Sequence, residues 1–94
     1  VIKLNPNNGN AFYNRGLEKH NSSQYYEAIS DYSKAIQINN KYSEAFLNRS
    51  VSKTKIGDIK GACKDAKKAK SLGFKGLEND NWIKNNCSSR FKFF

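Results

Sequence analysis

The sequence predicts an all-α fold, an α-α superhelix (solenoid) of antiparallel helix hairpins with a C-terminal capping helix. Three observations predict it. The chain repeats itself at a fixed offset, its apolar residues fall at helical spacing, and turn-forming residues separate the helical segments. These features are typical of stacked helical repeats, and no alternating strand pattern competes with them.

The repeat is clearest in two heptads. The stretch "NAFYNRG" from Asn10 to Gly16 returns as "EAFLNRS" from Glu44 to Ser50, an offset of 34 residues. The same offset pairs Lys19 with Lys53, Ala28 with Ala62, Asp31 with Asp65, and Ala35 with Ala69. We therefore divide the chain into the end of a preceding repeat (1–8), a first repeat (9–42), a second repeat (43–74), a capping helix (75–87) and a flexible tail (88–94), and expect it to belong to a longer protein.

Each repeat is predicted to be a helix, a tight turn and a second helix. The inward stripes of the second helices are Tyr25, Ala28, Ile29, Tyr32, Ala35 and Ile36, and then Ile59, Ala62, Cys63, Ala66 and Ala69. The first turn lies in "HNSSQ". In the second repeat Gly57 is expected to take the left-handed conformation, and Asp58 to cap the next helix.

The boundaries between repeats carry similar signals. Asn39 and Asn40 are expected to end the first repeat, Ser43 to cap the next helix and Gly73 to end the second repeat. The final helix is predicted from about Lys75 to Asn86. Its Leu77 and Trp82 are expected to cover the open end of the second repeat, with Ile83 as a further apolar residue. The opposite, N-terminal edge is the expected place for self-association.

Small residues allow the paired helices to approach each other. Gly16, Ala28 and Ala35 should bring the two backbones close, so that Phe12 and Tyr32 fill the space between them. A larger side chain at Ala28 should force the pair apart.

The charge is strongly positive and unevenly distributed. The formal net charge is +9; residues 1–43 hold five basic and three acidic side chains, and residues 44–94 hold twelve and five. Such a field can attract anionic partners, although it also serves solubility. The sequence has no apolar run of membrane-spanning length and no signal-peptide profile at its start.

Residues for catalysis or metal binding do not come together in the pattern. His20 is a single histidine near a helix end, and Asp31 and Asp65 are expected to serve the second helix of each repeat. We therefore expect no enzyme activity, no metal and no cofactor. Cys63 and Cys87 could form a disulfide if the last helix runs back along the helix of Cys63. The more common arrangement, a buried Cys63 and a free Cys87, is the one we expect.

The repeat resembles the tetratricopeptide repeat (TPR) family, and its bacterial members most. The residues that carry the resemblance are Phe12 and Phe46, Gly16 and Ser50, Ala28 and Ala62, Tyr32, Ala35 and Ala69, and Pro6. The departures are Arg15 and Arg49 in place of leucine, Lys19 and Lys53 in place of tyrosine or a small residue, Ala66 in place of an aromatic, and Asn40 and Phe74 in place of proline. We expect the two arginines to pair with acidic residues between repeats.

The resemblance implies a concave groove lined by the first helices. The residues that it places there are Asn10, Tyr13, Asn14, Leu17, His20, Asn21, Glu44, Leu47, Asn48, Val51, Thr54 and Lys55. Tyr13, Leu17, Leu47 and Val51 could seat apolar side chains of a peptide. Asn14 and Asn48 could grip its backbone or could only tie adjacent helices together. Because Tyr13 and Leu17 hold places of the lysine-asparagine carboxylate clamp, a chaperone-tail receptor is disfavoured.

These features favour a non-catalytic protein-protein interaction scaffold that binds a peptide or protein segment in the groove. The alternative is a binder of an anionic polymer such as RNA, or of a membrane surface, through lysines on the convex face. Those lysines are Lys60, Lys64, Lys67, Lys68, Lys70 and Lys75. Nucleic acid is the less expected partner, because this surface lacks interleaved aromatic residues and arginines.

Overall fold

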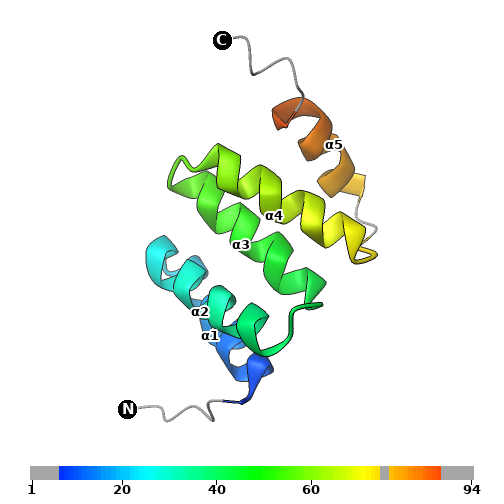
Figure 1. Cartoon of the computed structure of the whole chain (residues 1–94). Coiled ribbons are helices and arrows are strands. Elements are labelled where there is room, and N and C mark those ends of the chain that lie inside the picture. Colours follow the sequence, from blue (N-terminus) through cyan, green and yellow to red (C-terminus); the bar gives the residue numbers. More distant parts are fainter. Residues whose placement is uncertain (1–6, 75–76, 88–94) are drawn as a thin grey trace.

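The chain forms two helical hairpins in succession, followed by one more helix (Figure 1). The computed structural model describes residues 7–74 and 77–87, and for residues 77–81 it describes the backbone. The helices are α1 (Gly9–Asn21), α2 (Tyr25–Ile38), α3 (Ser43–Lys55), α4 (Ile59–Ser71) and α5 (Leu77–Asn86). The described residues contain no strand, so the predicted all-α fold of helix hairpins is confirmed.

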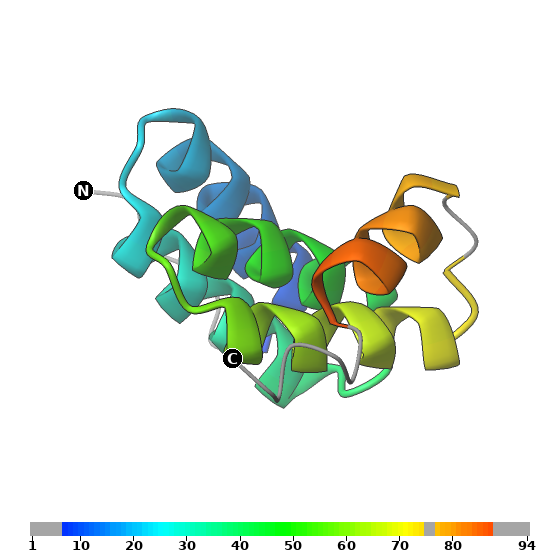
Figure 2. The same ribbon diagram turned by 90° about the horizontal axis from the view of Figure 1, so that it is seen from above.

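The helices lie in two layers. Figure 2 shows α1, α3 and α5 in one layer and α2 and α4 in the other. Each helix packs on the next one along the chain, and α1 also touches α3. Consecutive hairpins therefore stack in one direction instead of closing into a bundle. Among the described residues no helix has both the length and the apolar character needed to cross a lipid bilayer.

Three of the helices end in the same way. The backbone N–H groups of Gln24, Asp58 and Phe74 donate to the carbonyls of Lys19, Lys53 and Ala69, five residues back in each case, at 2.8, 2.9 and 3.1 Å. This is the bond of a Schellman turn, in which one residue takes a left-handed backbone conformation. Gly57 occupies that position with a φ of 85°, as predicted, and Gly73, which was predicted to end the second repeat, occupies it with a φ of 99°.

The first of these turns uses a residue other than glycine. Ser23 stands at the equivalent position with a φ of 63°. A side chain in this conformation carries a steric cost of about 1 kcal/mol that glycine avoids. The chain tolerates it because the turn's backbone hydrogen bonds are still made.

The helix starts differ from one another. Asn8 and Asp58 cap α1 and α4, accepting hydrogen bonds from the backbone N–H groups of Ala11 at 3.1 Å and Gly61 at 2.9 Å. The prediction that Ser43 caps the next helix is wrong. The helix begins one residue earlier than expected, so Tyr42 is the N-cap residue and Ser43 is the first residue of α3. The Ser43 hydroxyl donates to the Glu44 carboxylate at 3.1 Å.

Small residues form most of the core, as expected from the close approach of the helices. Its buried members are Ala28, Tyr32, Ala35, Ala45, Phe46, Ala62, Ala66 and Ala69. The expectation that Ile59 faces inward is wrong. It is 39% exposed at the first position of α4, where the helix has not yet reached the packed region.

Helix α5 is joined to α4 by a disulfide between Cys63 and Cys87. The expectation of a free Cys87 is therefore wrong. Helix α5 runs back along α4, so the two Cα atoms lie 5.7 Å apart, a separation at which the bond forms readily. Trp82 and Ile83 on α5 are half-buried. The expectations for Pro6, Lys75, the Leu77 side chain and the tail lie outside the described residues.

Candidate functional site

The residues predicted to line a groove lie on α1 and α3, in the same layer of the molecule (Figure 2). We call this surface the α1–α3 face. Its exposed members are Asn10, Asn14, Asn21, Glu44, Val51 and Lys55, and its half-buried members are Tyr13, Leu17, His20, Leu47, Asn48 and Thr54. Neither Tyr13 nor Leu47 is sealed in an interior, so the face stays open to a partner.

A cluster of tyrosines joins the two helices at one end of the face. The ring of Tyr13 lies 4.9 Å from that of Tyr42 and 5.8 Å from that of Tyr32, centroid to centroid. Burial is the main cause that raises the pKa of Tyr13, and Glu44 adds to it. Burial likewise raises the pKa of Tyr42. Both hydroxyls therefore stay protonated at neutral pH and are available for hydrogen bonds.

Polar contacts tie α1 to the following repeat along this face. The amide of Asn48 donates to the Tyr13 hydroxyl at 2.8 Å and to the Glu44 carbonyl at 3.0 Å. The hydroxyl of Tyr42 donates to Asn10 at 2.9 Å. Both donor hydrogens of the Asn48 amide are thus engaged within the protein, which favours the helix-tying role for Asn48.

His20 forms the contact at the far end of α1. Its Nδ1 lies 2.8 Å from the hydroxyl of Ser52, which is completely buried. Burial lowers the pKa of His20, and the positive charge of Lys55 lowers it further. The ring is therefore neutral at physiological pH, and it contributes a hydrogen bond between helices instead of a surface charge.

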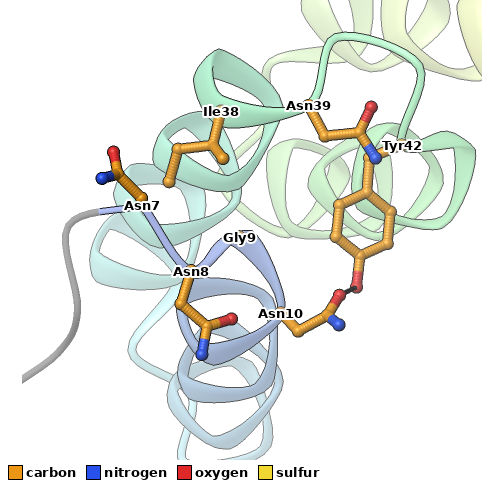
Figure 3. Close-up of a pocket in the computed structure, with 7 residues that line it drawn as sticks. All are labelled: Asn7, Asn8, Gly9, Asn10, Ile38, Asn39 and Tyr42. Atoms are coloured by element: carbon orange, nitrogen blue, oxygen red, sulfur yellow. Dashed lines mark hydrogen bonds between the residues drawn. The ribbon is translucent and has the colours of Figure 1, made fainter.

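Leu17, Leu47 and Val51 line none of the three surface depressions described below, which lie among described residues. One, of about 400 Å³, lies beside the start of α1 and is drawn in Figure 3. Its wall includes Asn10 and Tyr42, whose side chains are hydrogen-bonded to each other. Of the predicted groove residues, Asn10 is therefore also part of a hollow surface.

The two repeated arginines pair with the two repeated aspartates within each hairpin. Arg15 holds Asp31 through two bonds of 2.9 and 2.8 Å, and Arg49 holds Asp65 through two of 2.8 and 2.7 Å. The expectation that the arginines pair with acidic residues of another repeat is thus wrong. Each arginine pairs with the aspartate on the second helix of its own hairpin, because that helix packs directly on its own. These ion pairs therefore connect the two helices of each hairpin.

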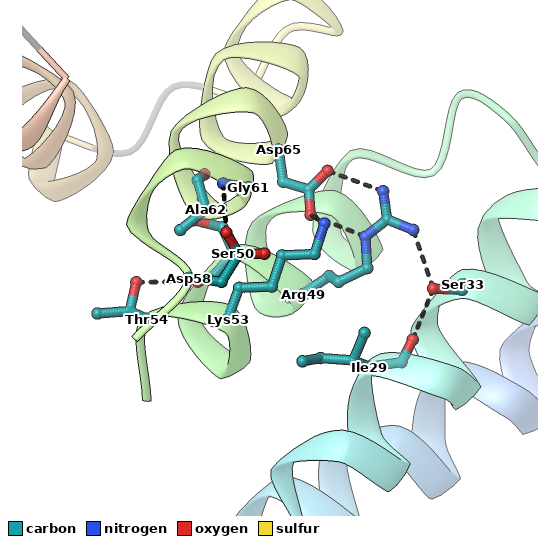
Figure 4. Close-up of polar contacts among 10 residues, drawn as sticks. All are labelled: Ile29, Ser33, Arg49, Ser50, Lys53, Thr54, Asp58, Gly61, Ala62 and Asp65. Atoms are coloured by element: carbon teal, nitrogen blue, oxygen red, sulfur yellow. Dashed lines mark hydrogen bonds and ion pairs between the residues drawn. The ribbon is translucent and has the colours of Figure 1, made fainter. Parts of the chain in front are cut away.

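Arg49 has an additional contact that spans the two hairpins. Its Nη1 donates to the hydroxyl of Ser33 on α2 at 3.0 Å, and Ser33 donates to the carbonyl of Ile29 at 2.7 Å (Figure 4). The Arg49 side chain is 17% exposed, whereas that of Arg15 is 36% exposed. Arg49 is less exposed because α2 of the preceding hairpin lies against α3. In the described part of the chain, no helix of a preceding hairpin lies against α1 in the same way.

This pairing left a signal in the sequence. Arg15 and Asp31 are 16 residues apart, and so are Arg49 and Asp65. Two opposite charges that recur at one separation and at one point of a repeat indicate a contact within the repeat. The guanidinium groups also lie 5.7 and 5.5 Å from the ring centres of Phe12 and Phe46, which places the arginine where an apolar residue would otherwise pack.

No protein-family model matches the chain, and no curated protein matches it. The described residues also contain no group of three or more histidine, cysteine, aspartate or glutamate side chains placed to hold a metal ion.

Proposed function

We propose that this chain is a non-catalytic interaction scaffold of the tetratricopeptide repeat type, and that its α1–α3 face binds a peptide or protein segment. The support is the internal 34-residue repeat together with hairpins that stack in one direction. Such stacking creates a continuous surface from equivalent helices, which suits recognition of an extended partner.

The observation that carries the proposal is an exposed apolar side chain on a face that is otherwise held rigid. Val51 is 40% exposed, and Leu17 and Leu47 are half-buried on the same face. The contacts at Tyr13 and His20 fix α1 against α3, so little conformational freedom is lost when a partner binds. The exposed amide of Asn14 is then a candidate for hydrogen bonds to a peptide backbone.

The experiment begins with selection of binding peptides from a displayed random library on the wild-type chain. Affinities of the selected peptides are then measured by calorimetry for Val51→Glu and for Ile59→Glu. Ile59 is the matched control, because it is a β-branched residue of nearly equal exposure on α4. We expect Val51→Glu to weaken binding at least about tenfold, since a charge is placed against an apolar contact.

Equal affinities for Val51→Glu and the wild type would contradict the site. Equal losses in both variants would point to a general effect of added negative charge. We expect both variants to fold, because both side chains are partly exposed in the wild type. Circular dichroism checks this.

A further inference from the structure

A depression of about 530 Å³ lies over α3 and α4, away from the α1–α3 face. It is lined by Phe46, five cationic side chains and one carboxylate. These residues are Arg49, Lys53, Lys64, Lys67, Lys68 and Asp65. We call it the basic pocket. This excess of positive charge raises the energy of the empty pocket, because like charges repel one another at short range.

The carboxylate of Asp65 cannot neutralise the pocket. It is buried, and it already accepts two bonds from Arg49 and an ion pair from Lys53 at 2.9 Å, as Figure 4 shows. Two cations therefore share one anion. In the described part of the chain no carboxylate lies within ion-pair distance of Lys64, Lys67 or Lys68.

The three remaining lysines share one side of α4. Lys67 and Lys68 follow Lys64 by three and four residues, which places each of them next to Lys64 on the helix. Like charges at these spacings destabilise a helix. All three side chains are exposed and could turn toward an anion in the pocket.

The first hairpin supplies an internal comparison. The equivalent depression over α1 and α2, about 340 Å³, is lined by Phe12, Arg15, Ser30, Asp31, Ser33, Lys34 and Gln37. The repeat offset places Ser30 opposite Lys64 and Ser33 opposite Lys67. The fold accepts neutral residues at these two places, so packing of the hairpin does not account for Lys64 and Lys67. Lys68 has a lysine, Lys34, at its equivalent position.

We propose that the basic pocket binds a compact anion that carries several phosphate groups. Lysine ammonium groups act as point charges that hold phosphate without a fixed orientation. An extended acidic peptide fits less well, because residues that share one face of an extended chain are about 7 Å apart, which spreads its charge. Neighbouring phosphates of a polyphosphate place more charge within the same volume.

The test is calorimetric titration of the disulfide-bonded chain with sodium tripolyphosphate at low ionic strength. The variant Lys64→Gln/Lys67→Gln/Lys68→Gln removes three charges from the pocket. The control Lys34→Gln/Lys41→Gln/Lys84→Gln removes three exposed lysine charges outside it, with Lys34 on the first hairpin. We expect the pocket variant to bind roughly tenfold or more weakly and the control to stay within about twofold of the wild type, because the charges close to the anion dominate.

Several results would overturn the proposal. They are the absence of tripolyphosphate binding by the wild type, an equal loss in both variants, and binding of hexaglutamate or of a uridine oligonucleotide that equals or exceeds that of tripolyphosphate. Glutamine is a good helix former, so folding of both variants is expected and is checked by circular dichroism.

A parallel measurement distinguishes the sources of the phosphate. Vesicles of phosphatidylcholine with phosphatidylinositol bisphosphate are compared with phosphatidylcholine alone in a sedimentation assay. Vesicle binding that the pocket variant loses supports a lipid headgroup as the ligand. Tripolyphosphate binding without vesicle binding supports a soluble one.

Discussion

Gly16 and Tyr32 are matched in size. A Cβ atom added at Gly16 would lie 2.6 and 2.8 Å from two ring atoms of Tyr32, and that ring is completely packed. At the equivalent positions of the second hairpin, Ser50 carries a Cβ and Ala66 lacks a ring. The hydroxyl of Ser50 donates to the carbonyl of Ala62 at 2.9 Å, where it is buried. The first hairpin thus pairs a glycine with a large ring, whereas the second has two small side chains at these positions.

Gly16→Ala should therefore destabilise the fold. The clash is expected to cost up to about 3 kcal/mol, of which the better helix propensity of alanine returns about 1 kcal/mol. The net decrease in the free energy of unfolding is measured by urea denaturation. The control is Gly9→Ala, whose added Cβ would meet its nearest atoms at an ordinary 3.6 Å. A Gly16→Ala variant as stable as Gly9→Ala would show that the Tyr32 ring moves freely.

His20 should make stability depend on pH. Burial lowers its pKa in the folded state below the ordinary value of 6.5, so the unfolded chain binds the proton more readily. The stabilising contribution is fully present above about pH 6.5 and is lost as the pH falls through the lower folded-state pKa. It is the one histidine of the sequence.

The measurement is the melting temperature between pH 8 and pH 5. We expect a decline for the wild type and a flatter profile for His20→Asn. Identical slopes for the two proteins would mean that other groups control this range.

Single residues were less predictable than the repeat that contains them. The repeat placed Asp31 and Asp65 at one point of the period, but the notion that they serve their own helix missed their contact with arginine. Composition alone could not show whether each arginine pairs with an aspartate of its own hairpin or with an acidic residue of the next one. The shared 16-residue separation was the only signal that could have done so.

At the level of elements, we expect α5 to depend on its covalent bond to α4. The bond between Cys63 and Cys87 closes a loop with a sequence separation of 24 residues, and α5 follows the two complete hairpins. Closing a loop of that length stabilises the closed form by about 3 kcal/mol in the chain-entropy account. Breaking the disulfide should therefore destabilise mainly α5.

We expect reduction by dithiothreitol to increase amide hydrogen exchange in α5 much more than in α1 to α3. The Cys63→Ala/Cys87→Ser variant should behave as the reduced protein does. If exchange rises equally in all helices, the bond supports the whole fold and not one element.

Helix boundaries were predictable where the chain carries a turn residue with a specific backbone need. Gly57 and Gly73 end α3 and α4 as predicted, because glycine is the residue that takes a left-handed conformation without strain. Ser43 misled the prediction, since serine is common both as a cap and in the first turn. The disulfide was one of two alternatives that the sequence left open, because it requires α5 to run back along α4 and the sequence gives only the order of the helices.

At the scale of the whole molecule, burial is greatest in the middle of the stack. Helices α2, α3 and α4 each contain four buried residues, whereas α1 contains one, Gly16. A helix with a neighbour on either side buries more than one at an edge. Stability in such a stack depends on contacts between adjacent units.

Native-state hydrogen exchange should therefore show the slowest amides in α2, α3 and α4 and faster ones in α1. Opening of α1 alone exposes little core and requires less free energy than global unfolding. Equal protection of α1 and α3 would indicate that the chain opens only as one unit.

The combination of Gly16 with Tyr32 in one hairpin and of Ser50 with Ala66 in the other limits how the two copies can recombine. A chimera that joined α3 to α2 would set a serine against a tyrosine ring, and one that joined α1 to α4 would leave an unfilled space beside a glycine. Only intact helix pairs can be duplicated or shuffled without a compensating substitution. The pair of helices, and not the single helix, is thus the unit in which such a sequence can be inherited or engineered.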